Sequence, residues 1–160
     1  MTAPTPQDHD FLTRVFALAQ RSRDAGHHPF AAIVAGADGT VIAEAMNASS
    51  ADRTAHAEMN ALRQASSKFS PAQLAGATLY SNAEPCAMCA GGAYWSGVGR
   101  VVYGMSETSL LALTGSDPEN PTLSLPCRQV FAAGQRPTEV VGPLREDEAR
   151  VAHEGFWRHP

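Results

Sequence analysis

Four side chains in two short segments carry the clearest chemical potential of this chain. His56-Ala57-Glu58 is the first segment, and Pro85-Cys86-Ala87-Met88-Cys89 is the second. One imidazole and two thiolates are three zinc ligands, which is the ligand count of a catalytic zinc site that leaves its fourth position open. A structural zinc would need four protein ligands, and no fourth ligand fits the spacing. Glu58, two residues from His56, is then free to transfer protons.

Each part of this pattern also has an ordinary interpretation. A C-x-x-C segment alone can be a redox pair of thiols. An isolated His56 would be a hydrogen-bonded surface or core residue, and Glu58 alone would be a carboxylate favoured by the positive end of a helix. The combination of the histidine, the glutamate and the C-x-x-C segment, in this order and with this gap, is much rarer than any one of these features alone. It therefore favours a catalytic zinc site.

The spacing of the ligands restricts how helices can hold them. Cys86 and Cys89 are three residues apart, so on a helix they share one face, and near its N-terminus the helix dipole favours both thiolates. His56 and Glu58 are two apart, which is not a same-face spacing. The pair can act together only if the metal lies off the N-terminal end of their helix. We therefore expect two helix N-termini to converge on one zinc.

Hydrophobic periodicity and turn signals predict an alternation of helices and strands. An Asp38-Gly39 turn joins two apolar runs into an antiparallel pair. The remaining strands alternate with helices, which predicts a mixed sheet with helices on its faces. Helices are expected at 8–25, about 54–66, 86–96, 106–113 and 144–158, strands at 30–37, 41–45, 77–81, 100–103 and 138–141, and a loop at 114–126.

Composition limits the classes of partner. The 160 residues are enough for one domain, with 44% hydrophobic residues and a net charge of −4. Only 12 residues are Lys or Arg, and Lys68 is the one lysine; this argues against a surface that grips nucleic acid. No apolar run reaches the roughly 20 residues of a membrane span, and the N-terminus lacks a secretory pattern. Three cysteines, two of them metal ligands, fit a reducing cytoplasm.

The H-x-E…P-C-x-x-C pattern resembles the signature of the cytidine-deaminase-like superfamily of zinc-dependent deaminases. The resemblance runs from about residue 11 to residue 102. It implies an α/β fold, a three-layer α/β/α sandwich around a mixed five-stranded sheet, in a single domain of residues 1–160. It also implies one Zn²⁺ per chain, Glu58 as the catalytic proton-transfer group, release of ammonia from an amino-heterocycle, and a homodimer.

Three stretches bear on the branch of this superfamily. Trp95, within 92–95, resembles bacterial guanine deaminases and other free-base deaminases, although it could simply pack on a helix face. Residues 84–91 and 99–104 resemble the tRNA adenosine deaminases, and Ser81-Asn82-Ala83 departs from the usual small residues before Glu84. Together with the acidic charge, Trp95 favours a free nucleobase or a related amino-heterocycle, with guanine first and isoguanine, cytosine analogues or aminotriazines next. The alternatives are tRNA adenosine deamination, nucleoside deamination, and a zinc-stabilised binding module without catalysis.

The resemblance also implies substrate contacts near the metal. Asn47 would read the ring edge of the base, or be a turn residue at the end of a strand. Phe30 would form a pocket wall, or pack in the core. Ala57 would contribute backbone groups to the site.

Further contacts are implied for the C-terminal third. Asp117 would be a second carboxylate against the base, or a solvated loop residue. Residues 144–160 form a helix or tail in which Phe156 and Trp157 would cover the active site, or simply end an amphipathic helix. Cys127 is predicted to be a buried thiol. Surface positions are predicted for His9, His27, His28, His153 and His159.

Overall fold

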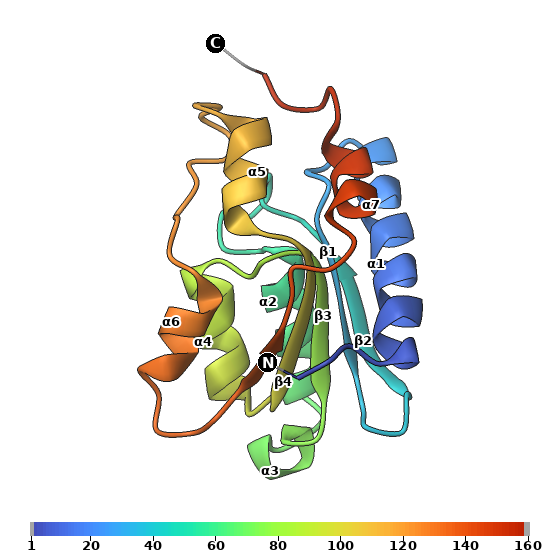
Figure 1. The fold of residues 1–160 in the computed structure, drawn as a ribbon, viewed down its shortest axis with the longest axis vertical. Helices are drawn as coiled ribbons and strands as arrows, with labels where there is room; N and C mark the ends of the chain where they lie inside the picture. The colour runs from blue at the N-terminus through green and yellow to red at the C-terminus, as the bar shows by residue number, and fades with distance from the viewer. Residues whose placement is uncertain (1, 159–160) are drawn as a thin grey trace.

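A mixed five-stranded sheet forms the centre of the protein (Figure 1). The computed structural model describes residues 2–158. The strand order is β2-β1-β3-β4-β5; β1 is antiparallel to β2 and β3, whereas β3, β4 and β5 are parallel. The strand bounds are Ala31–Ala35 for β1, Val41–Met46 for β2, Thr78–Ala83 for β3, Arg100–Met105 for β4 and Glu139–Val141 for β5.

Helices cover both faces of this sheet, which confirms the predicted α/β/α sandwich. One face carries α1 with α7 and the short 3₁₀ helix η1, and the other carries α2 and α4, with α6 against α4. The helix α5 follows β4 beyond the edge where that strand ends (Figure 1). The helices are α1 (Pro6–Asp24), α2 (Ala57–Ser66), α3 (Pro71–Leu74), α4 (Ala87–Ser96), α5 (Glu107–Thr114), α6 (Cys127–Ala132), α7 (Glu146–Arg150) and η1 (Val151–His153).

The central strand β1 shows why two helical layers are needed. Ala32 and Val34 are buried in the core cluster beneath α2 and α4, whereas Ala31 and Ile33 are buried in the cluster beneath α1. A strand covered on both faces is apolar at every position rather than alternating. The continuous apolar run that predicted this strand is therefore a consequence of the sandwich.

Two helix boundaries near the ligands differ from the expectation. His56 is the N-cap of α2 and Cys86 is the N-cap of α4, so each precedes its helix instead of lying in the first turn. The C-terminal helix is also shorter than the predicted 144–158. It ends as η1, because Glu154 is extended and Gly155 has a φ of +65°. The short helices α3 and α6 were not predicted from the sequence.

Within residues 2–158, no helix is both long and apolar enough to cross a membrane.

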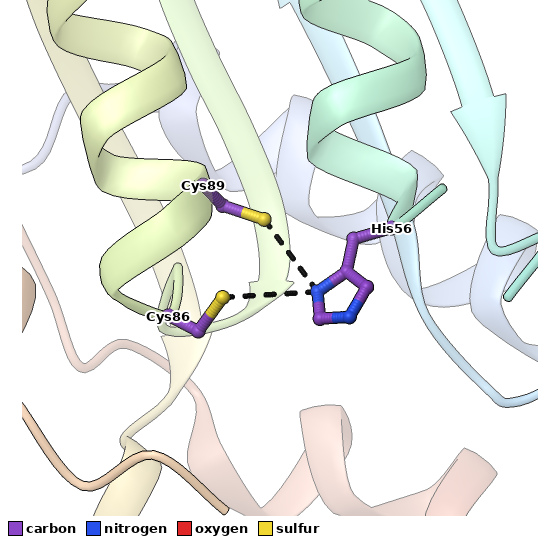
Figure 2. A group of neighbouring side chains, drawn as sticks. All are labelled: His56, Cys86 and Cys89. Carbon is purple, nitrogen blue, oxygen red and sulfur yellow. Dashed lines mark hydrogen bonds between the residues drawn. The ribbon is translucent and has the colours of Figure 1, made fainter. Parts of the chain in front are cut away.

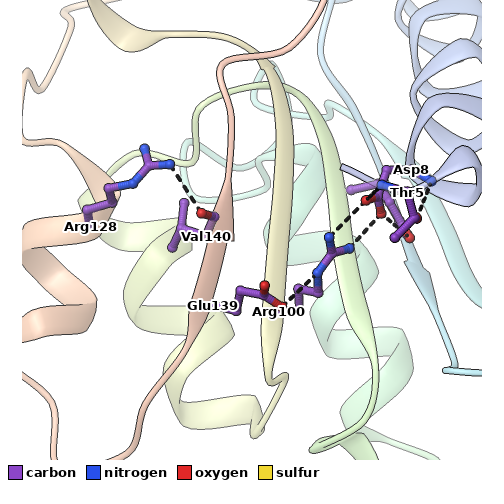
Figure 3. A network of polar contacts seen from close by, with 7 residues as sticks. Thr5, Asp8, Arg100, Arg128, Glu139 and Val140 are labelled. Carbon is purple, nitrogen blue, oxygen red and sulfur yellow. Dashed lines mark hydrogen bonds and ion pairs between the residues drawn. The ribbon is translucent and has the colours of Figure 1, made fainter. Parts of the chain in front are cut away.

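A buried ion pair fastens α1 to the sheet (Figure 3). Both oxygens of Asp8 accept from the Arg100 guanidinium, at 2.5 and 2.8 Å, and Arg100 also donates to Glu139 Oε2 at 2.9 Å. Burial raises the pKa of Asp8, but the hydrogen bonds from Arg100 and Thr5 outweigh it and lower that pKa to about 2. Helix α1 and strands β4 and β5 are thus joined by one guanidinium.

We expect Arg100→Met to lower the free energy of unfolding by about 3 kcal/mol, because it leaves the Asp8 carboxylate buried without its partner. Arg14→Met is the matched control, since Arg14 pairs with Glu44 near the surface and its loss should cost less than about 1 kcal/mol. Urea unfolding at neutral pH measures both. Equal losses would contradict the assignment of Arg100 as an anchor of the fold.

Candidate active site

Two helix N-termini bring the three predicted zinc ligands together (Figure 2). His56 Nδ1 lies 3.7 Å from Cys86 Sγ and 3.6 Å from Cys89 Sγ. The three ligand atoms lie within 4.8 Å of one another, and no other group of possible metal ligands is found in the described residues. Helices α2 and α4 pack side by side on the same face of the sheet, which is what makes this meeting possible.

These distances fit a tetrahedral zinc. With Zn–N near 2.0–2.1 Å and Zn–S near 2.3 Å, the edge between a nitrogen and a sulfur ligand is roughly 3.6 Å. The charge of the ligand set also fits. Hydrogen bonds with Cys89 and His56 lower the pKa of Cys86 to about 4. The pKa of Cys89 is instead raised, by its contact with Cys86 and by burial. The two thiols can both lose their protons this close together only if a cation lies between them, and a divalent metal supplies it.

Glu58 faces the ligands from the first turn of α2. Its Oε2 lies 3.6 Å from Cys89 Sγ, and its Oε1 accepts a hydrogen bond from Ser81 Oγ at 2.9 Å. The residue is buried, and this burial raises the pKa of Glu58. Ser81 was missed as a positioning residue, although the unusual 81–83 segment was a signal that something differs here. A buried carboxyl held by one hydroxyl is well placed to carry protons.

A cavity of about 320 Å³ opens over these groups, within the size range of small-molecule sites. Its walls come from the C-terminal end of β3, the segments that follow β2 and precede β1, the starts of α2, α4 and α5, and the loop that follows α5. Ligands of α/β sheets commonly bind at such strand ends. The loop was predicted as a loop, but its role as a wall was not predicted. The lining includes Met88, Leu110, Pro121, Thr122 and Leu123, together with the residues discussed below.

Asn47 and Phe30 both line this cavity, and their contacts with a substrate stay a prediction. Asn47 Oδ1 accepts from the backbone N–H and the hydroxyl of Ser49, at 2.9 and 2.8 Å. Its Nδ2 group has no hydrogen-bond partner among the described residues, which leaves two N–H donors for a ligand. Phe30 packs against the rings of His153 and Trp157, so it belongs to both the wall and the core.

Two carboxyl groups beside the metal ligands have different tasks. Glu84 accepts from the backbone N–H groups of Glu107 and Cys127, at 3.1 and 2.9 Å, and thereby joins β3 to the starts of α5 and α6. The Glu107 carboxyl instead lines the cavity. Burial first, and then the nearby Cys86, Glu84 and Glu58, raise the pKa of Glu107 to about 8. No sequence motif marks Glu107, whose only signal is its place just after a predicted strand.

Ala57 and Trp95 lie outside the cavity lining. Ala57 is fully buried at the start of α2, and its proposed backbone contact stays a prediction. Trp95 is 81% exposed on α4, where it contacts Tyr94 edge-on. Within one chain the indole does not line the cavity, and a contact of Trp95 with a substrate, which its resemblance to free-base deaminases implies, stays a prediction. The side chain points outward because it stands on the face of α4 away from the sheet.

Asp117 is only 4% exposed, which corrects the interpretation of a solvated loop residue. Its carboxylate accepts from the backbone N–H groups of Glu119 and Arg158, at 2.9 and 2.7 Å, and therefore fastens the loop to the C-terminal tail. Asp117, Phe156 and Trp157 line a second cavity of about 540 Å³. This cavity shares Asn47 with the first, so the tail lies beside the site. Closure of the site by the tail stays a prediction.

His153 is 1% exposed, so the prediction of a surface histidine was wrong. Trp157 Nε1 donates to its Nδ1 at 3.1 Å, and Asn82 Nδ2 lies 3.2 Å from its Nε2. Burial lowers the pKa of His153 to about 3, which keeps the ring neutral. The imidazole links the tail to β3. Cys127 is buried, as predicted, and His159 lies outside the described residues.

The fold and the metal ligands identify the family of this chain. Residues 5–105 match the cytidine and deoxycytidylate deaminase zinc-binding region. This match spans more than half of the sequence, and the chain belongs to this family of zinc-binding deaminases.

Three relatives show the range within the family. A probable cytosine deaminase of Schizosaccharomyces pombe is 38% identical over 157 residues, 98% of this chain and 96% of the relative. Guanine deaminase of Bacillus subtilis is 41% identical over 101 residues, 62% of this chain and 64% of that enzyme. The solved guanine deaminase of Nitrosomonas europaea superposes with a TM-score of 0.76 at 27% identity, over 98% of this chain and 86% of that one.

We expect Cys89→Ala to lose bound zinc, because two ligands hold the metal far more weakly than three. The loss should also lower the melting temperature, since metal binding contributes to folding stability. Cys127→Ala is the control: this thiol is buried but does not belong to the group of three ligands, so its removal should leave about one zinc per chain. Metal content of the purified variants, measured by mass spectrometry, tests the assignment. Full zinc in Cys89→Ala would contradict it.

Proposed function

We propose that the chain catalyses hydrolytic deamination of a free nucleobase or a related amino-heterocycle, with guanine as the first substrate to test. The observation that supports this most is the position of Glu58 and the three ligand atoms at one small cavity. Water and the amino-heterocycle give the keto compound and ammonia. Cytosine, isoguanine and aminotriazines belong to the same proposal, since the relatives include both a probable cytosine deaminase and guanine deaminases.

The residues of the chain account for the proton transfers. Zinc, when bound by His56, Cys86 and Cys89, supplies the Lewis acidity that makes water a nucleophile near neutral pH. Glu58 accepts one proton of the attacking water and delivers it to a ring nitrogen. It then takes the second proton from the new hydroxyl, as that oxygen becomes the keto oxygen, and passes it to the departing amine, which leaves as ammonia. The Ser81 hydroxyl holds Oε1 of that carboxyl, which leaves Oε2 turned toward the ligands. Asn47 orients the ring through its free N–H donors.

Size and charge favour a small substrate over RNA. The cavity of about 320 Å³ suits a single heterocycle. The protein carries a net charge of −4, and only 12 of its 160 residues are Lys or Arg. Such a surface would repel the phosphates of a tRNA. The thiolate ligands fit a cytoplasmic, reducing location.

The test is ammonia release from guanine, isoguanine, cytosine, adenine, their nucleosides and a tRNA anticodon stem-loop. We expect turnover of at least one free base, and Glu58→Gln should lower it by about 10²–10⁴-fold while zinc is retained, since only the proton carrier is changed. Thr54→Val, at an exposed hydroxyl before α2, is the control and should keep most activity. Turnover of the stem-loop alone would favour tRNA deamination. An active, zinc-loaded Glu58→Gln would remove Glu58 from the mechanism.

We also propose a homodimer that forms through α4. The 81% exposed Trp95 stands on this helix, and a Cβ at Gly91 would meet no atom within 4 Å, so part of α4 is open and apolar. Exposed aromatic residues of this kind are enriched at interfaces. A partner surface over Trp95 would return the indole to a buried environment.

Trp95→Asp should convert the dimer to a monomer, because a carboxylate would be desolvated at the contact. Val151→Asp is the control, since Val151 is 54% exposed on η1, against the opposite face of the sheet. Light scattering at micromolar concentration gives both masses. A wild-type mass near 16.9 kDa would refute the dimer.

A further inference from the structure

Glu107 is a buried carboxyl group for which the mechanism has no task. It is 7% exposed and lines the cavity beside the metal ligands. Its backbone N–H donates to Glu84, but its carboxyl oxygens have no hydrogen-bond partner within residues 2–158. Neither oxygen is sealed from the cavity. The group therefore opens toward the space that a substrate would fill.

A carboxyl in this position needs a donor from the ligand. A buried polar group without a hydrogen bond costs free energy. A substrate that displaces water from the cavity without donating to Glu107 would therefore bind less tightly. Whether charged or protonated, the carboxyl offers an oxygen lone pair to an N–H group. Leu110 and Met88, which also line the cavity, have no such donor, and none of the polar lining residues donates to this carboxyl in the part of the chain that the structure describes.

Asn47 and Glu107 offer opposite chemistry within one cavity. Asn47 has two unused N–H donors, which suit a carbonyl oxygen or an unprotonated ring nitrogen. Glu107 suits an N–H. Free nucleobases carry a ring N–H at the nitrogen that is bonded to the sugar in a nucleoside, and a nucleoside has no hydrogen there to donate.

We propose that Glu107 is a substrate-binding residue that accepts a hydrogen bond from the ring N–H of an unglycosylated amino-heterocycle, and so selects free bases over nucleosides. This inference rests on the proposed deaminase function and names its substrate class. A site that is built to hydrogen-bond one group rejects analogues without it, because its own polar group is then left unpaired.

A role restricted to helix stability predicts a different result. Glu107 is the first residue of α5, where a carboxylate is favoured by the helix dipole. However, Ser106 caps this helix through Ser109, and Glu146 accepts from the Ser106 N–H and hydroxyl, both at 2.9 Å. The start of α5 is thus held by groups outside the cavity. Loss of a purely structural Glu107 would lower activity on every substrate by the same factor.

The experiment compares cytosine with 1-methylcytosine and guanine with 9-methylguanine, in the zinc-loaded protein. We expect the wild type to favour each parent base at least tenfold in kcat/KM. Glu107→Leu should lower kcat/KM for the parent bases by about 10- to 100-fold, mainly through KM, and change the methylated bases less than threefold. Glu107→Gln keeps an acceptor oxygen and should restore most of the preference.

Glu146→Gln is the matched control for a disturbed start of α5: it should lower the melting temperature but keep the preference for parent bases. Zinc content and melting temperature are measured for every variant. Equal losses on parent and methylated bases in Glu107→Leu, or a wild type without preference, would overturn the role of Glu107 and leave the deaminase function intact. Absence of turnover on every base by the wild type would overturn the proposed function, and this inference with it.

Discussion

Three ligand atoms within the span of one ion are the constraint on which the rest of this structure depends. His56 and the two cysteines belong to segments that are separated by a full helix, a turn and a strand. The sheet brings these segments together, because α2 and α4 pack on the same face of it and begin at the same edge. Met59 of α2 packs against Gly92 of α4, where a Cβ would lie 2.5 Å from Met59 Sδ. The metal site is therefore a property of how two helices are placed, and of the helix ends in particular.

The cavity, like the metal site, is formed by the ends of strands and helices and by the segments next to them, and not by the middle parts of these elements. Its walls are the end of β3, the segments next to β1 and β2, the starts of α2, α4 and α5, and the loop that follows α5. Glu84 holds several of these pieces at once, with its backbone N–H on Met105 and its carboxylate on Glu107 and Cys127. Hydrogen bonds of this kind, made by a buried carboxylate to backbone donors, are charge-assisted and relatively strong. These hydrogen bonds hold the segments around the cavity in fixed positions, and with them the side chains that face the cavity.

The C-terminal tail is fastened to the body by contacts from several distant segments. Arg23 donates to the carbonyls of Ala152 and Glu154, Asp117 accepts from the backbone of Arg158, and Trp157 donates to His153. These contacts explain why an acidic loop residue and a histidine are buried. They also place aromatic side chains next to the site, where a mostly apolar surrounding strengthens the electrostatic interactions of the groups inside.

Local pattern determined the ligands, the five strands and the longer helices along the chain, and the α/β class, because ligand spacing and hydrophobic periodicity are written in consecutive residues. The family membership rests on the same segments. Tertiary structure alone decided the positions of Glu107, Ser81 and Asp117, whose roles depend on neighbours 23 to 41 residues away. It also decided that Trp95 faces outward and His153 inward. The neighbouring residues in the sequence do not indicate whether a residue on a helix, such as Trp95, or a short polar residue, such as Ser81, is buried or exposed. Burial and the cavity arise only when segments that are distant in the sequence pack together.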